Sequence, residues 1–258
     1  MLAVLSPSKT LDFGSKAVTR KCSEPEFLSD SRELVDKLRS LSERQLRNLM
    51  DISPKLAALN HERYQTWSPP FTPKNARQSL LAFKGDVYNG FNLEEYSPKD
   101  FEFAQKHLRI LSGLYGVLKP LDLIQPYRLE MGTSLKTGRG KDLYAFWGTA
   151  ITDALNRELD NRAQPVLVNL ASNEYFSSVD EGRLQARVIS PAFKDLNKGK
   201  YKILSFFAKR ARGEMANFII RNRITNPSGL TDFNAVGYRY DAESSTEDKP
   251  VFLRDQPE

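Results

Sequence analysis

The chain has 258 residues, of which 40% are hydrophobic and 27% are charged, a composition that is ordinary for a soluble globular protein. It carries 38 Lys and Arg against 32 Asp and Glu, a formal net charge of +6, and its one cysteine, Cys22, excludes an intramolecular disulfide. The sequence has no apolar run near the roughly 18 residues of a membrane span. The first residues, MLAVLSPSKT, lack a basic segment and predict a strand rather than a signal peptide, so we expect a cytoplasmic protein.

Helices and strands are expected to interleave irregularly. Leucines at helical spacing and Ser-Pro helix starts predict helices at residues 31–50 (as two, because Ser42 and Gln45 are typical of a capping box), 54–67, 97–111, 142–159 and 215–223. Apolar runs predict strands at residues 2–5, 166–170, 187–193, 202–207, 238–240 and 251–253, and QSLLAFKGDVYNG predicts a strand that enters a glycine-rich turn. We therefore expect an α+β fold: one domain, residues 1–258, with a mixed central β-sheet wrapped by helices.

The charge is distributed unevenly. Residues 183–223 contain eleven basic residues against only Asp195 and Glu214, a net charge of +9. From about residue 241 the chain is an acidic tail, which can be flexible, with six acids against Lys249 and Arg254. A basic block of this size favours a polyanionic partner, DNA above all, although a solvated surface explains it as well.

The stretch LSGLYGVLKPLDLIQPYRLEMG, residues 111–132, is too broken for a plain helix and too apolar for a solvated loop. A helix over residues 97–111, a turn at Gly113 and Gly116, and a second short helix near Lys119 predict a helix-hairpin-helix-like element. Its backbone amides and Lys119 would attract a DNA phosphate without reading the base sequence. The local sequence fits equally well a buried turn that packs its leucines.

The stretch FFAKRARGEMANFIIRNR places Lys209, Arg210 and Arg212 where a strand is expected to end and a helix to begin. Cations at a helix N-terminus oppose the macrodipole, and an anion bound there would offset this cost. We therefore include these three residues among the candidate phosphate-binding residues. The alternative is that they precede the helix and are solvated.

Three polar loops follow apolar, strand-like runs, and strand ends often line clefts in proteins with parallel strands. Their side chains predict a polar cleft that contains Lys9, Asp86, Arg128, Glu130 and Asn173. A mixed acid–base cleft suits an enzyme pocket or a phosphate site, and buried salt bridges and helix caps are the structural alternative. The two histidines, His61 and His107, are far apart and have no Cys or His at ligand spacing, so we expect no metal and no cofactor.

Six long blocks of the sequence together resemble the YaaA family of bacterial peroxide-stress-response proteins. In chain order they are SPSKTLDF, LAFKGDVYNGF, LSGLYGVLKPLDLIQPYRLEMG, GKDLYAFWG, NLASNEYF and FFAKRARGEMANFII. The resemblance implies a cytoplasmic bacterial protein that limits oxidative DNA damage by holding down free intracellular iron under hydrogen peroxide. It also implies DNA binding through a helix-hairpin-helix and a positively charged cleft, but it supplies no reaction.

The leading hypothesis is thus a non-enzymatic protein of the peroxide stress response that binds DNA non-specifically. Because the sequence shows no iron site, we expect any effect on iron to be indirect. The first alternative is an enzyme that acts on a phosphorylated or nucleotide-like small molecule in the polar cleft. The second is a module that binds a partner protein through the acidic tail. The sequence leaves the oligomeric state open.

Overall fold

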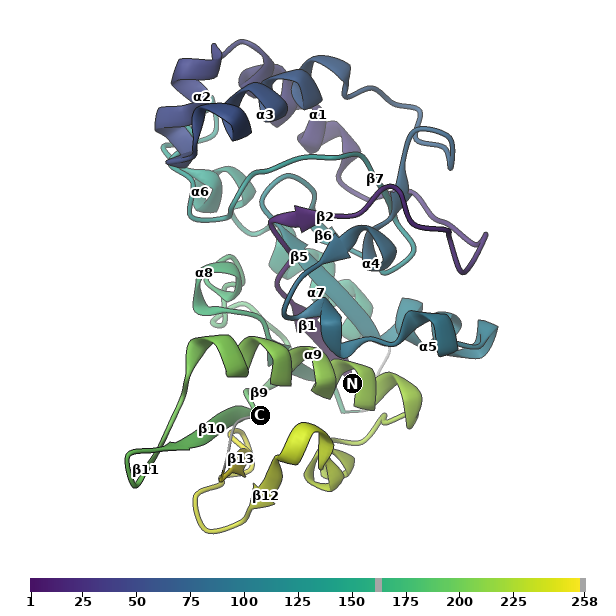
Figure 1. Cartoon of the computed structure of the whole chain (residues 1–258), viewed down its shortest axis with the longest axis vertical. Coiled ribbons are helices and arrows are strands. Elements are labelled where there is room, and N and C mark those ends of the chain that lie inside the picture. Colours follow the sequence, from purple (N-terminus) through teal and green to yellow (C-terminus); the bar gives the residue numbers. More distant parts are fainter. Residues whose placement is uncertain (161–163, 256–258) are drawn as a thin grey trace.

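The structure is a computed structural model that describes residues 1–160 and 164–255. Helices surround a mixed β-sheet, so the predicted α+β fold is confirmed (Figure 1). The strand order of the central five-stranded sheet is β6-β5-β1-β8-β9. These strands are β1 (Leu2–Leu5), β5 (Leu108–Ser112), β6 (Gly116–Leu118), β8 (Val166–Leu170) and β9 (Arg187–Ile189).

Strand β1 occupies the middle of this sheet and pairs in parallel with both β5 and β8. All of its residues are buried, and parallel strands that are covered on both faces have such unbroken apolar sequences. The carboxyl ends of β1 and β8 therefore lie at the same edge of the sheet. The polar segments that follow them, residues 6–10 and 172–174, are brought together there.

A second sheet has the order β11-β10-β13-β12. Its strands are β10 (Ala192–Asn197), β11 (Lys200–Lys202), β12 (Arg239–Asp241) and β13 (Val251–Arg254). Strand β13 lies between β10 and β12, and its four residues are buried. The acidic segment from residue 241, which we expected as a tail that can be flexible, thus contains β13, and strand hydrogen bonds and apolar side chains hold this strand in the second sheet. Residues 256–258 of that tail lie outside the described residues.

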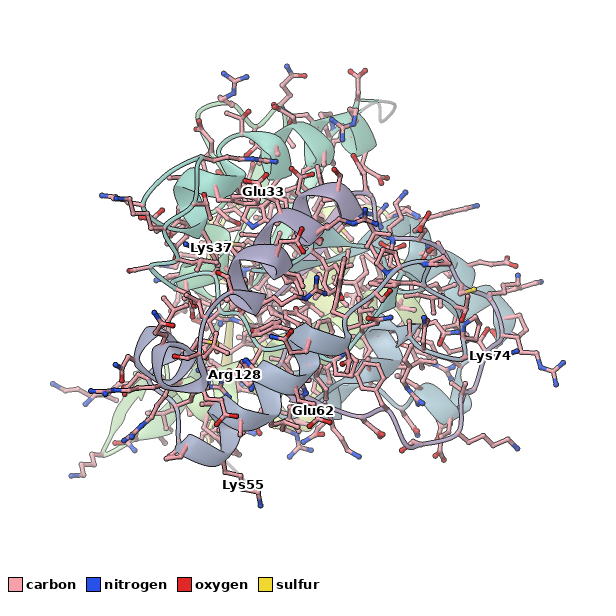
Figure 2. All side chains as sticks on the ribbon, turned by 90° about the horizontal axis from the view of Figure 1, so that it is seen from above. Glu33, Lys37, Lys55, Glu62, Lys74 and Arg128 are labelled. Atoms are coloured by element: carbon pink, nitrogen blue, oxygen red, sulfur yellow. The ribbon has the colours of Figure 1, made fainter. Side chains whose placement is uncertain are left out.

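Helices α1 (Leu28–Arg39), α2 (Glu43–Met50) and α3 (Pro54–Thr66) pack together at one end of the molecule (Figure 1). The predicted capping box is confirmed, because the Ser42 side chain accepts a hydrogen bond from the Gln45 amide and the Gln45 side chain accepts one from the Ser42 amide. Figure 2 looks down on this end, where Lys37 of α1 and Lys55 of α3 are exposed to solvent.

The remaining elements are short except for one helix. They are β2 (Thr10–Leu11), β3 (Arg77–Gln78), α4 (Ser79–Ala82), β4 (Phe83–Lys84), η1 (Tyr88–Gly90), η2 (Leu93–Glu95), α5 (Pro98–His107), β7 (Leu123–Ile124), α6 (Leu143–Trp147), α7 (Ala150–Leu159), α8 (Asn173–Phe176), η3 (Pro227–Asp232) and η4 (Ala235–Gly237). The helix expected at residues 142–159 is divided into α6 and α7, because Gly148 has a φ of +49° and ends α6.

The long exception is α9 (Ser205–Arg221), which crosses the molecule between the two sheets (Figure 1). It packs against β1 and β8 of the central sheet and against β10 of the second sheet. The expected strand at residues 202–207 and the late helix start at residue 215 are therefore wrong. The helix begins ten residues earlier, because Ala208, Ala211, Met215 and Ile219 form one buried helical face against both sheets.

Candidate functional site

The glycine-rich stretch forms a β-hairpin and not a helix-hairpin-helix. Helix α5 ends at His107, and the chain then continues as β5, a tight turn and β6, which pairs antiparallel with β5. Residues 111–118 are all buried. The alternative of a buried turn is thus correct, because the apolar residues on both sides of the turn form two strands of the central sheet.

Gly113 and Gly116 are required by close packing in this hairpin. A Cβ atom on Gly113 would lie 2.4 Å from the carbonyl oxygen of Leu129, and one on Gly116 would lie 2.8 Å from the Trp147 ring. Gly116 also has a φ of +69°, which favours glycine. The indole Nε1 of Trp147 donates a hydrogen bond of 3.0 Å to the carbonyl oxygen of Gly113. These contacts leave no path for a DNA phosphate to reach the turn, so the predicted phosphate-binding role of the two glycines is wrong.

Lys119, the third predicted residue of the hairpin, takes part in a local ion-pair cluster. Its Nζ atom lies 3.2 Å from Glu158, and the buried Arg109 lies 2.7 Å from the same carboxylate. Its backbone amide donates a 2.7 Å hydrogen bond to Asp122. Lys119 therefore follows the end of a buried strand hairpin, among carboxylates, and is not the start of a helix.

Asp122 makes the stability of this hairpin depend on pH. Burial raises its pKa to about 6, against the lowering effect of hydrogen bonds from Ser23 and from the Lys119 amide. A group whose folded pKa is raised stabilises the fold below its unfolded pKa, and it loses this contribution as the pH rises through the folded value. We therefore expect the stability of the wild-type chain to fall relative to that of Asp122→Asn between about pH 4 and pH 6. Urea unfolding of both proteins across this range checks the prediction, and parallel curves would contradict it.

A pocket of about 320 Å³ lies where the carboxyl ends of β1 and β8 meet α9. Four segments line it: residues 6–10, residues 85–87, parts of residues 170–175, and Lys209 with Arg212 of α9. Two predicted cleft residues, Lys9 and Asp86, are among the lining residues. The sequence analysis proposed the polar cleft and the phosphate-binding residues as two separate sets. The tertiary structure brings members of both sets to one pocket.

The other predicted cleft residues lie next to this pocket. Glu130 contacts Lys9 at 2.6 Å and Arg128 at 2.9 Å, so these three side chains form one ion-pair chain that begins at the pocket rim. Arg128 is also anchored through its backbone carbonyl, which accepts a hydrogen bond from Tyr64 of α3. Asn173 is exposed and does not line the pocket, whereas its neighbour Glu174 does.

The three cations of α9 have different surroundings. Lys209 and Arg212 are three residues apart, so they lie on the same side of the helix and both line the pocket. Arg210 points elsewhere: it is exposed and lies 3.6 Å from Glu214. None of the three is at the helix N-terminus, so a macrodipole effect does not explain them.

Comparison with protein families assigns this chain to a family. The family described as "Peroxide stress protein YaaA" matches residues 1–244. The chain belongs to the YaaA family. The match spans both sheets, except for β13, as well as the segments that line the pocket. The family assignment supports a general role in the oxidative stress response.

Sequence reasoning missed the residue that shapes this YaaA-family pocket, Gly213. A Cβ atom at this position would lie 1.7 Å from the carbonyl oxygen of Val87, so glycine lets α9 touch the loop that carries Asp86. A glycine inside a helical pattern was the available signal, because it is costly there unless packing requires it. The hydroxyl groups of Ser6 and Ser172, 3.2 Å apart, were also missed; they join the two strand ends at the floor of the pocket.

The described part of this YaaA-family chain offers neither a cluster of metal ligands nor a membrane-spanning helix. Residues 1–160 and 164–255 bring no group of three or more His, Cys, Asp or Glu side chains into a metal-binding arrangement. The same residues include no helix that is both long and apolar enough to cross a membrane.

Proposed function

We propose that this chain serves the peroxide stress response as a non-specific DNA-binding protein, and that its contact surface is the β10–β11 hairpin with the start of α9. We call this surface the basic arm; it consists of Lys198 to Lys202 together with Ile203 and Phe206. In this proposal the protein limits oxidative damage to DNA, and its effect on free intracellular iron is indirect. The observation that carries the proposal is the unpaired, exposed positive charge of the arm.

Ion pairs divide the basic block of residues 183–223 into two groups. One group is neutralised by carboxylates and consists of Arg183, Arg187, Arg210, Arg221 and Arg223. The other group has no carboxylate partner within the described part of the chain and consists of Lys194, Lys198, Lys200, Lys202, Lys209 and Arg212. Three of these six, Lys198, Lys200 and Lys202, lie within five residues of one another on the basic arm.

The basic arm projects from the body of the molecule (Figure 1). Lys198 and Gly199 have φ values of +50° and +75°, and two positive φ values in a two-residue loop are typical of a type I′ hairpin turn. All three lysines are exposed. Exposed apolar side chains accompany them, with Ile203 at 56% and Phe206 at 60% exposure. An exposed phenylalanine beside lysines offers a stacking surface next to phosphate contacts.

A two-stranded β-ribbon fits the major groove of a DNA duplex. Lysine ammonium groups are point charges that neutralise phosphates without reading base edges. The arm therefore supports binding that varies little with base sequence and weakens with salt, because each neutralised phosphate releases counterions. The predicted contact at the glycine hairpin is replaced by this one.

The test is a salt titration of DNA binding with duplex, single-stranded and branched DNA. We expect the substitution of Lys198, Lys200 and Lys202 by Ala to weaken duplex binding about tenfold or more at low salt. The plot of the logarithm of the binding constant against the logarithm of the salt concentration should become less steep, by about 0.9 for each lost phosphate contact.

The matched control replaces three exposed lysines at the opposite end of the molecule, Lys37, Lys55 and Lys74 (Figure 2). Both triple variants lose the same net charge, so a general electrostatic effect would weaken them equally. The control should retain a salt slope close to that of the wild-type protein. Equal losses in the two variants, or no DNA binding by the wild-type protein at low salt, would reject the basic arm as the contact surface.

A further inference from the structure

The pocket at the carboxyl ends of β1 and β8 contains an arginine whose charge no other described residue offsets. Arg212 is about half-buried and lines the pocket, and no hydrogen bond or ion pair joins its guanidinium to residues 1–160 or 164–255. Burial lowers its pKa, and no nearby carboxylate acts in the opposite direction. A desolvated cation without a counter-ion costs free energy, so a site of this kind is stabilised by an anion.

Other arginines of the described chain that are at least half-buried have partners. Arg63 has no carboxylate beside it either, but its guanidinium donates a hydrogen bond of 3.2 Å to the side-chain oxygen of Asn60. Arg109, Arg128 and Arg254 each have a carboxylate within 3 Å, at 2.7, 2.9 and 2.6 Å. The fold thus pairs these arginines with acids from elsewhere in the chain. Arg212 is left to a partner from outside the chain.

Lys209 lies one helical turn before Arg212 on the same side of α9 and lines the same pocket. It too lacks a carboxylate partner among the described residues. A planar guanidinium with a flexible ammonium beside it suits a phosphate group, which can take a two-pronged contact from the arginine and a point charge from the lysine. Two cations also match the two negative charges of a phosphate monoester.

Two carboxylates also line the pocket. Glu174 accepts a hydrogen bond of 3.0 Å from the backbone amide of Gly132, whereas Asp86 has no such partner in the described part of the chain. Asp86 follows Gly85 in the loop that α9 touches, and it is about half-buried with no hydrogen bond or ion pair to other described residues. A bare anion would gain nothing from Asp86, whereas a hydroxyl or amino group could donate a hydrogen bond to it. The pocket is therefore built for a ligand that carries an anion and, apart from it, a hydrogen-bond donor.

The size of the pocket limits the ligand further. A volume of about 320 Å³ lies at the lower end of the range of small-molecule sites. Lys9, which pairs with Glu130 at 2.6 Å, is one of the lining residues. A single phosphorylated sugar or mononucleotide fits such a space, whereas a duplex does not.

We propose that this pocket binds a small phosphate monoester, with its phosphate on Arg212 and Lys209 and a hydroxyl or amino group donating to Asp86. This site is separate from the basic arm, and the proposal does not depend on DNA binding. It gives the polar cleft a binding role without assigning a reaction to it.

The experiment measures binding of inorganic phosphate, ribose 5-phosphate, AMP and adenosine to the full chain by calorimetry. We expect inorganic phosphate to bind. At least one of the two monoesters should bind more tightly than phosphate, with a dissociation constant of about 1 mM or lower. Adenosine should bind at least about tenfold more weakly than AMP. Arg212→Gln should weaken phosphate and monoester binding about tenfold or more, because a charge-assisted contact is lost. Arg210→Gln, two residues away on the exposed side of α9, is the matched control and should bind like the wild-type protein.

Two further readouts separate a ligand site from a merely structural arginine. Arg212→Gln removes an uncompensated charge, so its thermal midpoint without ligand should equal or exceed that of the wild-type protein, and only the wild-type midpoint should rise on adding the monoester. Asp86→Asn should reduce the preference for the monoester over inorganic phosphate, because it removes a charge that repels the phosphate in both ligands and weakens the acceptor for the hydroxyl or amino group of the monoester. The proposal is overturned if the wild-type chain binds neither monoester, or if Arg212→Gln binds both as well as the wild-type protein does. DNA binding by Arg212→Gln should be retained, so failure of one proposal does not decide the other.

Discussion

Gly213→Ala is expected to destabilise the protein by about 3 kcal/mol or more, at the upper end for overpacking of a tightly packed contact. A Cβ atom at this position would lie 1.7 Å from the carbonyl oxygen of Val87 and 2.7 Å from its carbonyl carbon. The contact is reciprocal, because a Cβ atom on Gly90 would lie 2.6 Å from the backbone nitrogen of Glu214. Both partners are backbone atoms, which cannot rotate away.

The sign of this effect is what makes the variant informative. Alanine is favoured over glycine inside a helix by about 1 kcal/mol, so local propensity predicts that Gly213→Ala stabilises α9. We expect the opposite in urea unfolding. Gly138→Ala is the control, since a Cβ atom there would meet nothing within 4 Å. A Gly213→Ala protein as stable as the control would mean that α9 does not touch the loop at Val87.

The variant also connects packing with the pocket. Helix α9 carries Lys209 and Arg212, and the loop that it touches carries Asp86. A shift of α9 away from this loop separates the two cations from the carboxylate. In the fraction of Gly213→Ala that remains folded, we therefore expect weaker binding of phosphate monoesters than in Gly138→Ala.

Asp195→Asn is expected to cost about 3–5 kcal/mol of stability, because it removes one partner of a buried ion pair and leaves the other buried and charged. Asp195 is fully buried, and it accepts a hydrogen bond of 2.6 Å from the Nε atom of Arg254. It also accepts one from the hydroxyl group of Tyr238 at 3.0 Å. The pair lies between β10 and β13, in the interior of the second sheet, where Asp195 and Arg254 are register partners.

An exposed ion pair of the same sheet provides the comparison. Asp255 lies 2.7 Å from Arg239, but both side chains are more than half exposed. Exposed pairs of this kind contribute little, so Asp255→Asn should leave the unfolding midpoint nearly unchanged. Similar midpoints for Asp195→Asn and the wild-type protein would show that the buried pair is not needed to hold the second sheet together. Because β10 also carries the basic arm, we expect Asp195→Asn to lose DNA binding together with stability.

The sequence by itself determined the elements whose signals are local. The apolar run of residues 2–5 identified β1, and the pair Ser42 and Gln45 identified the start of α2. The short strands β12 and β13 were also expected from the sequence, although the burial of β13 was not. Caps and short apolar runs act over a few residues, so they can be recognised without the rest of the fold. The family resemblance also belongs here, since it rests on blocks of residues in order along the chain.

Only the tertiary structure showed why the glycines are required and which charged residues have partners. In the sequence alone, Gly116 is compatible with a phosphate-binding turn and with a packed hairpin. The ring of Trp147, about thirty residues further along the chain, packs against Gly116 and so excludes the phosphate-binding turn. The sequence gives no reason to distinguish the three cations of α9, Lys209, Arg210 and Arg212. Among the described residues, only Arg210 has a carboxylate beside it. The partner of a charge or of a missing Cβ atom is set by chain segments that are distant in sequence, so no local pattern carries this information. Short-range signals therefore located elements such as β1 and α2. Long-range packing decided the extent of α9, the form of the glycine hairpin and which residues are left to bind something else.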